Sequence, residues 1–131
     1  MVKFGYTILY VEDVEKSIEF YENVFEFERK FITPDNDYGE LNTGETTISF
    51  ASKKLGTQNL EDGFLESSLK DKPFAIELAF ITDDVGHLVQ KATSFGAVLV
   101  SEPKKKPWGQ VVAYVRDTDG FLLEICTPVH S

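Results

Sequence analysis

Two glutamates stand among apolar strand residues, where a charged side chain is unusual. Glu77 precedes the apolar run 78–81, and Glu124 lies between Leu123 and Ile125. Side chains alternate between the two faces of a strand, so a helix that covers Leu123 and Ile125 leaves Glu124 on the opposite face. A carboxylate among apolar neighbours is costly to bury unless a partner satisfies it. Two such carboxylates brought together would also repel each other.

That repulsion can be relieved in three ways, and the sequence leaves all three open. A divalent cation can bind, with Glu77, Glu124 and Tyr6 as ligands; oxygen ligands alone would favour Mg²⁺ or Mn²⁺ over Zn²⁺. One carboxyl can stay protonated near neutral pH and act as a general acid or base, which makes Glu77 and Glu124 the catalytic candidates. The pair can also be neutralised by a ligand, a cationic side chain or backbone donors.

The elements that carry these residues occur twice along the chain. The run that starts at Tyr6 and the run that starts at Glu77 both end in an acidic pair followed by a helical pattern, 71 positions apart. Each half then closes with a hairpin, and the turn 117–120 has the strongest hairpin signal. Each half is predicted to be βαβββ. The expected strands are 4–11, 27–33, 38–42, 46–51, 74–82, 98–100, 111–116 and 121–126, with helices from 14 and over 85–95 and a loop over 102–109.

The predicted fold is therefore α+β, with two βαβββ modules forming a curved eight-stranded cup and the helices outside. We expect residues 1–131 to form a single domain, with modules at 4–52 and 74–128 and a linker at 53–73. In such a duplicated fold, equivalent positions of both copies are expected at one pocket. By alternation Tyr6 and Tyr10 share a face of the first strand. Tyr6, Tyr10 and Trp108 are the ligand-binding residues predicted on these grounds.

Composition excludes several functions. The net charge of −9 argues against nucleic acid as a partner, and no run is long enough to span a membrane. Cys126 is the single cysteine, which excludes an internal disulfide and suits a reducing compartment. We expect a soluble cytoplasmic protein whose partner is a small molecule.

The chain resembles the vicinal oxygen chelate superfamily, which includes glyoxalases, dioxygenases and bleomycin-resistance proteins. The resemblance rests on residues 8–21, 78–85 and 114–125, the last with Thr118 where the family's Asp-Pro-Asp-Gly turn has proline. It implies the glyoxalase-like fold and a homodimer. It also implies four positions for a divalent metal (Mg, Mn, Ni or Zn), which in this sequence are Tyr6, Ser49, Glu77 and Glu124. Only through this resemblance does Ser49 join the predicted ligand-binding residues.

Three of the four positions depart from the family pattern, because Tyr6 and Glu77 stand where histidine is common and Ser49 replaces a carboxylate or similar ligand. The only histidines, His87 and His130, are predicted to be solvated surface residues. Two functions remain. One is a small-molecule-binding protein of the bleomycin-resistance type, without the histidine-containing metal site. The alternative is a metal-dependent glyoxalase-like lyase or isomerase acting on a substrate with vicinal oxygens.

Overall fold

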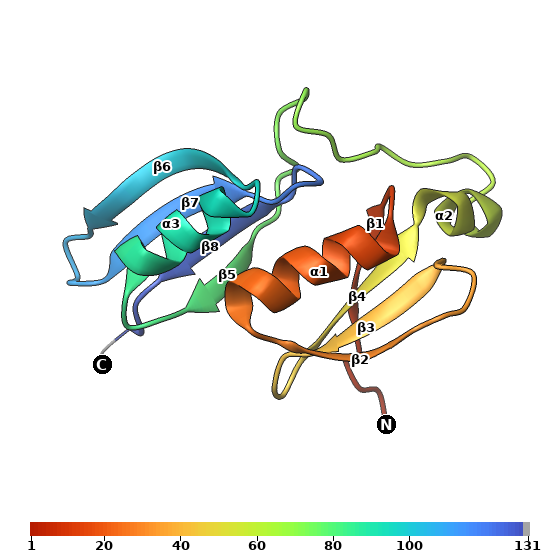
Figure 1. Ribbon diagram of the computed structural model, residues 1–131, viewed down its shortest axis with the longest axis horizontal. Coiled ribbons are helices and arrows are strands. Elements are labelled where there is room, and N and C mark those ends of the chain that lie inside the picture. The colour runs from red at the N-terminus through yellow and green to blue at the C-terminus, as the bar shows by residue number, and fades with distance from the viewer. Residues whose placement is uncertain (130–131) are drawn as a thin grey trace. The chain divides into compact units, whose positions relative to one another are not determined.

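The computed structural model describes residues 1–129 and divides the chain into two compact units, residues 1–66 (module 1) and 67–131 (module 2). The element order is βαβββ in each module, with one extra helix at the end of module 1 (Figure 1). His130 lies outside the described residues. The predicted α+β class with two βαβββ modules is confirmed, and each module forms a four-stranded mixed sheet.

Module 1 contains β1 (Thr7–Val11), α1 (Val14–Phe25), β2 (Glu28–Ile32), β3 (Tyr38–Asn42), β4 (Thr47–Ser52) and α2 (Lys53–Asn59). The strand order is β1-β4-β3-β2, with β1 parallel to β4 and the other pairs antiparallel. Asp13 caps α1 by accepting a hydrogen bond from the Lys16 amide. The apolar stripe of α1, with Ile18 and Tyr21 fully buried, packs on one face of the sheet.

Module 2 repeats this plan with β5 (Leu78–Ile81), α3 (Val85–Ser94), β6 (Val98–Lys105), β7 (Val111–Arg116) and β8 (Leu122–Cys126). The strand order is β5-β8-β7-β6, with β5 parallel to β8. Helix α3 covers the face that carries Val115, Leu123 and Ile125, all of them fully buried. The opposite face of the module 2 sheet carries Glu124, and the opposite face of the module 1 sheet carries Ser49 and Tyr10, with α2 packed over Tyr10.

One local expectation was wrong. The predicted loop 102–109 is strand as far as Lys105, because Lys104 and Lys105 pair with Val112 and Val111 after two register shifts along β6. Within the expected linker, residues 53–59 form α2, which begins where the Ser52 side chain accepts a hydrogen bond from the Leu55 amide. The Ser52 cap fixes where α2 begins, and packing against β1 and β4 holds this short helix in place.

No helix among the described residues is long and apolar enough to cross a membrane.

Candidate functional site

Three polar side chains meet on the helix-free face of module 2. Strand register places Ala79, Glu124 and Tyr114 side by side across β5, β8 and β7. The Tyr114 hydroxyl donates a hydrogen bond of 3.0 Å to Glu124 Oε1. Glu77 stands two residues before Ala79, close enough to Glu124 for the two carboxyls to influence each other. The structure therefore brings both predicted glutamates together and adds Tyr114.

This arrangement shifts the pKa values of Glu77 and Tyr114. Glu77 is exposed, but partial desolvation of its carboxyl and the neighbouring Glu124 carboxyl raise its pKa above its ordinary value. The hydrogen bond to Glu124, with partial burial, raises the pKa of Tyr114 to about 12. Glu77 thus keeps a proton at pH values where an ordinary glutamate has lost it. It is a group that can give up a proton when a cation or a basic ligand arrives.

Cys126 lies on the same face but is not a nucleophile. Burial and the neighbouring Glu124 carboxylate raise the pKa of its thiol to about 11, so the thiolate is scarce at neutral pH. Its Sγ lies 3.8 Å from the carbonyl oxygen of Phe80. Cys126 is a small buried side chain in the wall of the site.

Trp108 lies in the turn between β6 and β7 and is 63% exposed. Its indole N–H donates to Gln110 Oε1 at 2.9 Å, and the Gln110 amide in turn donates to the carbonyl of Thr127 at 2.9 Å. Gln110 also lies beside the Cys126 thiol. The indole is thus fixed by a side chain that borders the site wall, with its large apolar surface still free.

Module 1 places different residues at the equivalent positions. Ile8 pairs with Ser49 as Ala79 pairs with Glu124, so Tyr6 and Ser49 are the counterparts of Glu77 and Glu124. Tyr6 is 55% exposed, whereas Ser49 is fully buried and its Oγ makes no hydrogen bond within the described residues. The two positions that hold paired carboxyls in module 2 hold a phenol and an alcohol in module 1.

Glu40 is opposite Ser49 in the register, and its Oε2 accepts a 2.7 Å hydrogen bond from the Tyr38 hydroxyl. Partial burial raises the pKa of Tyr38; the nearby Ser49 hydroxyl opposes this shift and the Glu40 carboxylate adds to it. Tyr38 therefore stays a hydrogen-bond donor to Glu40 at neutral pH.

Tyr10 is covered by the segment that follows β4. Its ring centroid lies 4.8 Å from that of Phe64, and the same two rings close over Gly56 in α2. A Cβ at Gly56 would approach the Phe64 ring to 2.8 Å, which shows how tightly α2 sits here. The structure gives Tyr10 an intramolecular aromatic partner within module 1.

The donor set differs from the histidine-containing metal site that the family resemblance implies. Among residues 1–129 there is no group of three or more histidine, cysteine, aspartate or glutamate side chains placed to hold an ion. His87, in the first turn of α3, is exposed. Phenol and alcohol oxygens at Tyr6 and Ser49 are poor substitutes for the imidazole and carboxylate ligands of a zinc centre. Within module 2 the two carboxyls of Glu77 and Glu124 lie near each other.

Replacing Glu77 with glutamine is expected to raise the melting temperature at neutral pH and to leave it unchanged in acid. The Glu77 pKa is raised on folding, so its stabilising contribution is full below the ordinary value of 4.5 and is lost as pH rises through the folded-state pKa. Glutamine has no charge to lose, so the variant's advantage should grow with pH. Thermal unfolding between about pH 4 and pH 8 measures it.

Glu102→Gln is the matched control, because Glu102 is exposed on β6 and the substitution changes the net charge equally. An equal gain in both variants would trace the effect to overall charge. A loss of stability in Glu77→Gln would instead mean that Glu77 serves a structural partner.

Two βαβββ modules, each with a helix on one sheet face and polar residues on the other, define a protein of the glyoxalase-like fold. The profile of the Glyoxalase/Bleomycin resistance protein/Dioxygenase superfamily matches residues 3–125, so the chain belongs to this superfamily. The crystal structure of a glyoxalase-related enzyme from Fulvimarina pelagi has the same fold, with a TM-score of 0.81 at 19% identity over 98% of this chain and 89% of that one.

Two curated relatives are similar over 94% of the chain. A lactoylglutathione lyase of Arabidopsis thaliana is 30% identical over 128 residues, but the chain spans only 43% of that protein's length. A virulence protein of Salmonella typhimurium is 25% identical over 127 residues, which make up 82% of its length. The chain therefore spans less than half of the plant relative.

Sequence reasoning missed the partners of the predicted residues. Alternation alone does not assign a face to Tyr114, although the turn at 117–120 sets a register that pairs it with Glu124. Glu40 could have been found in the same way, since the turn between β3 and β4 places it opposite Ser49. Lys30 of β2 lines a pocket in module 1. Its position could not be predicted from the sequence, because a register shift in β2 decides which side of the sheet its side chain takes.

Proposed function

We propose that the chain binds a cationic small molecule at the helix-free face of module 2, without a histidine-containing metal site. The observation that carries this is the cluster of Glu77, Glu124 and Tyr114, in which the Tyr114 hydroxyl donates to Glu124 and the Glu77 carboxyl lies nearby. The ion pairs of the described residues lie elsewhere, at Arg29 and Lys53, so no lysine or arginine neutralises these two carboxyls. An ammonium group placed between them would remove their repulsion and donate charge-assisted hydrogen bonds to both carboxylates.

Aromatic surface supports a ligand that carries a ring as well as a charge. Tyr114 lies against Glu124, and Trp108 is held at the edge of the same sheet by Gln110. Cations bind favourably over aromatic faces, and the net charge of −9 draws cations toward the protein. Binding would displace the proton that Glu77 retains, so affinity should increase with pH as the raised Glu77 pKa is crossed.

Isothermal titration with benzylamine, and separately with metal-free bleomycin, tests the proposal. We expect binding in the native chain to weaken by about tenfold or more in the double variant Glu77→Gln/Glu124→Gln, since each charged hydrogen bond contributes about 1.5–3 kcal/mol. Glu102→Gln should bind as the native chain does. If neither cation binds, or if the double variant binds equally well, the site is not a cation receptor.

The similarity to a lactoylglutathione lyase favours a second candidate, a metal-dependent lyase or isomerase acting on a substrate with vicinal oxygens. Here Glu124 would be a metal ligand, and Glu77 a ligand or the group that moves the proton. The test is the melting temperature of the native chain and its variants in the presence of Mg²⁺, Mn²⁺, Ni²⁺ or Zn²⁺, because an ion that binds only the folded chain raises this temperature. A shift abolished by Glu124→Ala, together with lactoylglutathione turnover, would favour the lyase over the receptor.

The homodimer and the cytoplasmic location expected from the sequence stay predictions. Size-exclusion chromatography with light scattering addresses the first and fractionation of cells the second.

A further inference from the structure

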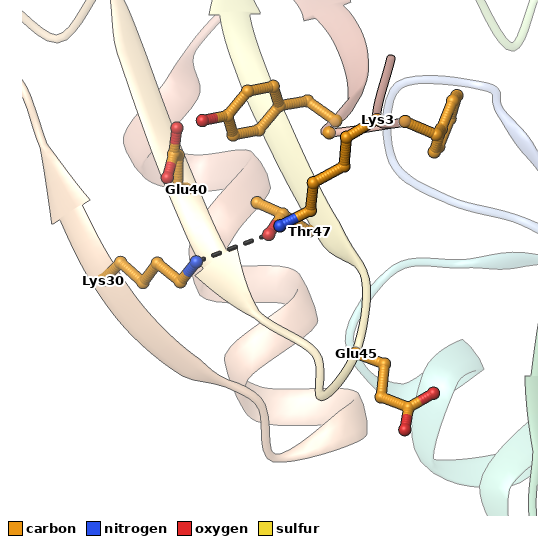
Figure 2. Close-up of a pocket in the computed structure, with 8 residues that line it drawn as sticks. Lys3, Lys30, Glu40, Glu45 and Thr47 are labelled. Carbon is orange, nitrogen blue, oxygen red and sulfur yellow. Dashed lines mark hydrogen bonds between the residues drawn. The ribbon is translucent and has the colours of Figure 1, made fainter. Parts of the chain in front are cut away.

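Module 1 contains an open pocket of about 450 Å³ on the side of its sheet that faces away from α1 (Figure 2). Its lining includes two lysines, Lys3 and Lys30, and the aromatic ring of Tyr6. Glu40 and Thr47 form part of its wall. The volume is within the usual range for small-molecule sites.

Lys30 reaches this pocket because of a β-bulge. The pairing of β2 with β3 shifts between Arg29 and Phe31, so Lys30 is the extra residue on the edge strand. Arg29 bonds Glu15 and Glu22 of α1 on the helix side of the sheet. Lys30 instead extends across the other side, where its Nζ donates to Thr47 Oγ1 at 3.3 Å (Figure 2). Bulges at sheet edges commonly redirect a side chain toward a site in this way.

The pocket lining beside Lys30 offers a carboxylate acceptor, Glu40. Glu40 accepts the Tyr38 hydroxyl through Oε2, which leaves Oε1 available to a second donor. Ser49, opposite Glu40 in the register, is fully buried beside the Tyr38 hydroxyl and is not part of the lining.

The charged side chains of the pocket do not form ion pairs with one another. Lys3, Lys30, Glu40 and Glu45 are all in its lining, yet no ion pair of residues 1–129 involves any of them. Figure 2 shows Glu45 pointing away from the other labelled side chains. Two ammonium groups therefore face an incoming ligand together with one carboxylate, Glu40. This balance suits a singly charged anion that also carries a hydrogen-bond donor, and disfavours a doubly charged phosphate.

We propose that this pocket binds a small organic acid with a hydroxyl next to its carboxylate. The carboxylate would lie against the Lys3 and Lys30 ammonium groups, the hydroxyl would donate to Glu40, and an apolar substituent would pack on Tyr6. The inference goes beyond the function proposed for module 2, because it uses other residues and a ligand of opposite charge.

Two-dimensional NMR titration of ¹⁵N-labelled protein with mandelate is the test, since mandelate has the carboxylate, the adjacent hydroxyl and a ring. We expect shift changes at the amides of Tyr6, Lys30 and Thr47. Phenylacetate, which lacks the hydroxyl, and mandelamide, which lacks the charge, should bind more weakly, and phenyl phosphate should bind no better than mandelate.

Lys30→Gln should weaken mandelate binding by about tenfold, the effect of losing one charged hydrogen bond. Lys54→Gln is the matched control, because Lys54 is an exposed lysine of α2 outside the pocket. Glu77→Gln/Glu124→Gln should bind mandelate normally, which separates this site from the module 2 site. The inference is overturned if mandelate shifts no pocket amides, if Lys30→Gln and Lys54→Gln bind alike, or if phenylacetate binds as well as mandelate.

Discussion

Replacing Arg116 with methionine is expected to lower the free energy of unfolding by about 3 kcal/mol, because it leaves buried carbonyl groups without donors. Arg116 is only 8% exposed. Its guanidinium donates to three backbone carbonyls, those of Gly120, Asp71 and Ser68, at 2.9, 2.7 and 2.9 Å. Methionine fills similar volume but donates nothing. Urea denaturation of the variant and the native chain at one pH measures the difference.

Arg29→Met is the control for this prediction. Arg29 forms two ion pairs, with Glu15 and Glu22, but its side chain is 31% exposed. Exposed ion pairs contribute roughly 0–1 kcal/mol, so this variant should lose no more than that. The loss of stability in Arg116→Lys should lie between those of the two methionine variants, because one ammonium group cannot reach all three carbonyls that the planar guanidinium contacts. Equal losses at Arg116 and Arg29 would contradict the argument.

The Arg116 contacts matter for the site because they attach residues 68–71, near the start of module 2, to the β7–β8 hairpin. Arg116 pairs with Leu122 at the end of β7 and β8, the two strands that carry Tyr114 and Glu124. Ser67 adds a hydrogen bond of 2.9 Å from its Oγ to the Asp119 carbonyl. The chain before β5 is thereby held against the turn, which limits the freedom of the segment leading to Glu77.

Alternation and duplication predicted the positions of the glutamates. Glu77 and Glu124 occur at matching places in a strand pattern whose apolar face is easy to recognise, and a one-residue slip would expose Leu123 and Ile125. The pairing of Ala79 with Glu124, and of Ile8 with Ser49, agrees with the equivalence read from the repeat. Burial of the apolar face of a strand therefore fixes which residues lie on its opposite face.

Features that depend on irregular backbone were not predictable in the same way. Lys30 enters its pocket through a register shift, and β6 continues to Lys105 through two more, none of which has a composition signal. The helix α2 is short and contains Gly56, so its propensity is weak. Its formation depends on packing against β1 and β4, which local sequence does not reveal.

Replacing Gly120 with alanine is expected to lower the free energy of unfolding by about 2 kcal/mol, from backbone strain and a close contact together. Gly120 closes the β7–β8 turn with a φ of +93°, a conformation that residues with a Cβ rarely adopt. A Cβ there would lie 2.7 Å from the carbonyl carbon of Ser68 and 3.0 Å from Arg116 Nη2. Either the turn or the segment at Ser68 must move.

Gly86→Ala is the matched control, because Gly86 lies in the first turn of α3 and a Cβ there would meet nothing within 4 Å. Alanine favours helix over glycine by roughly 0.5–1 kcal/mol, so this variant should be more stable than the native chain. The Gly120 substitution acts through the contacts that Arg116 makes. The losses of Gly120→Ala and Arg116→Met should therefore be less than additive in the double variant. Full additivity would mean that the two residues stabilise the hairpin independently, and that the guanidinium does not depend on the conformation of the turn.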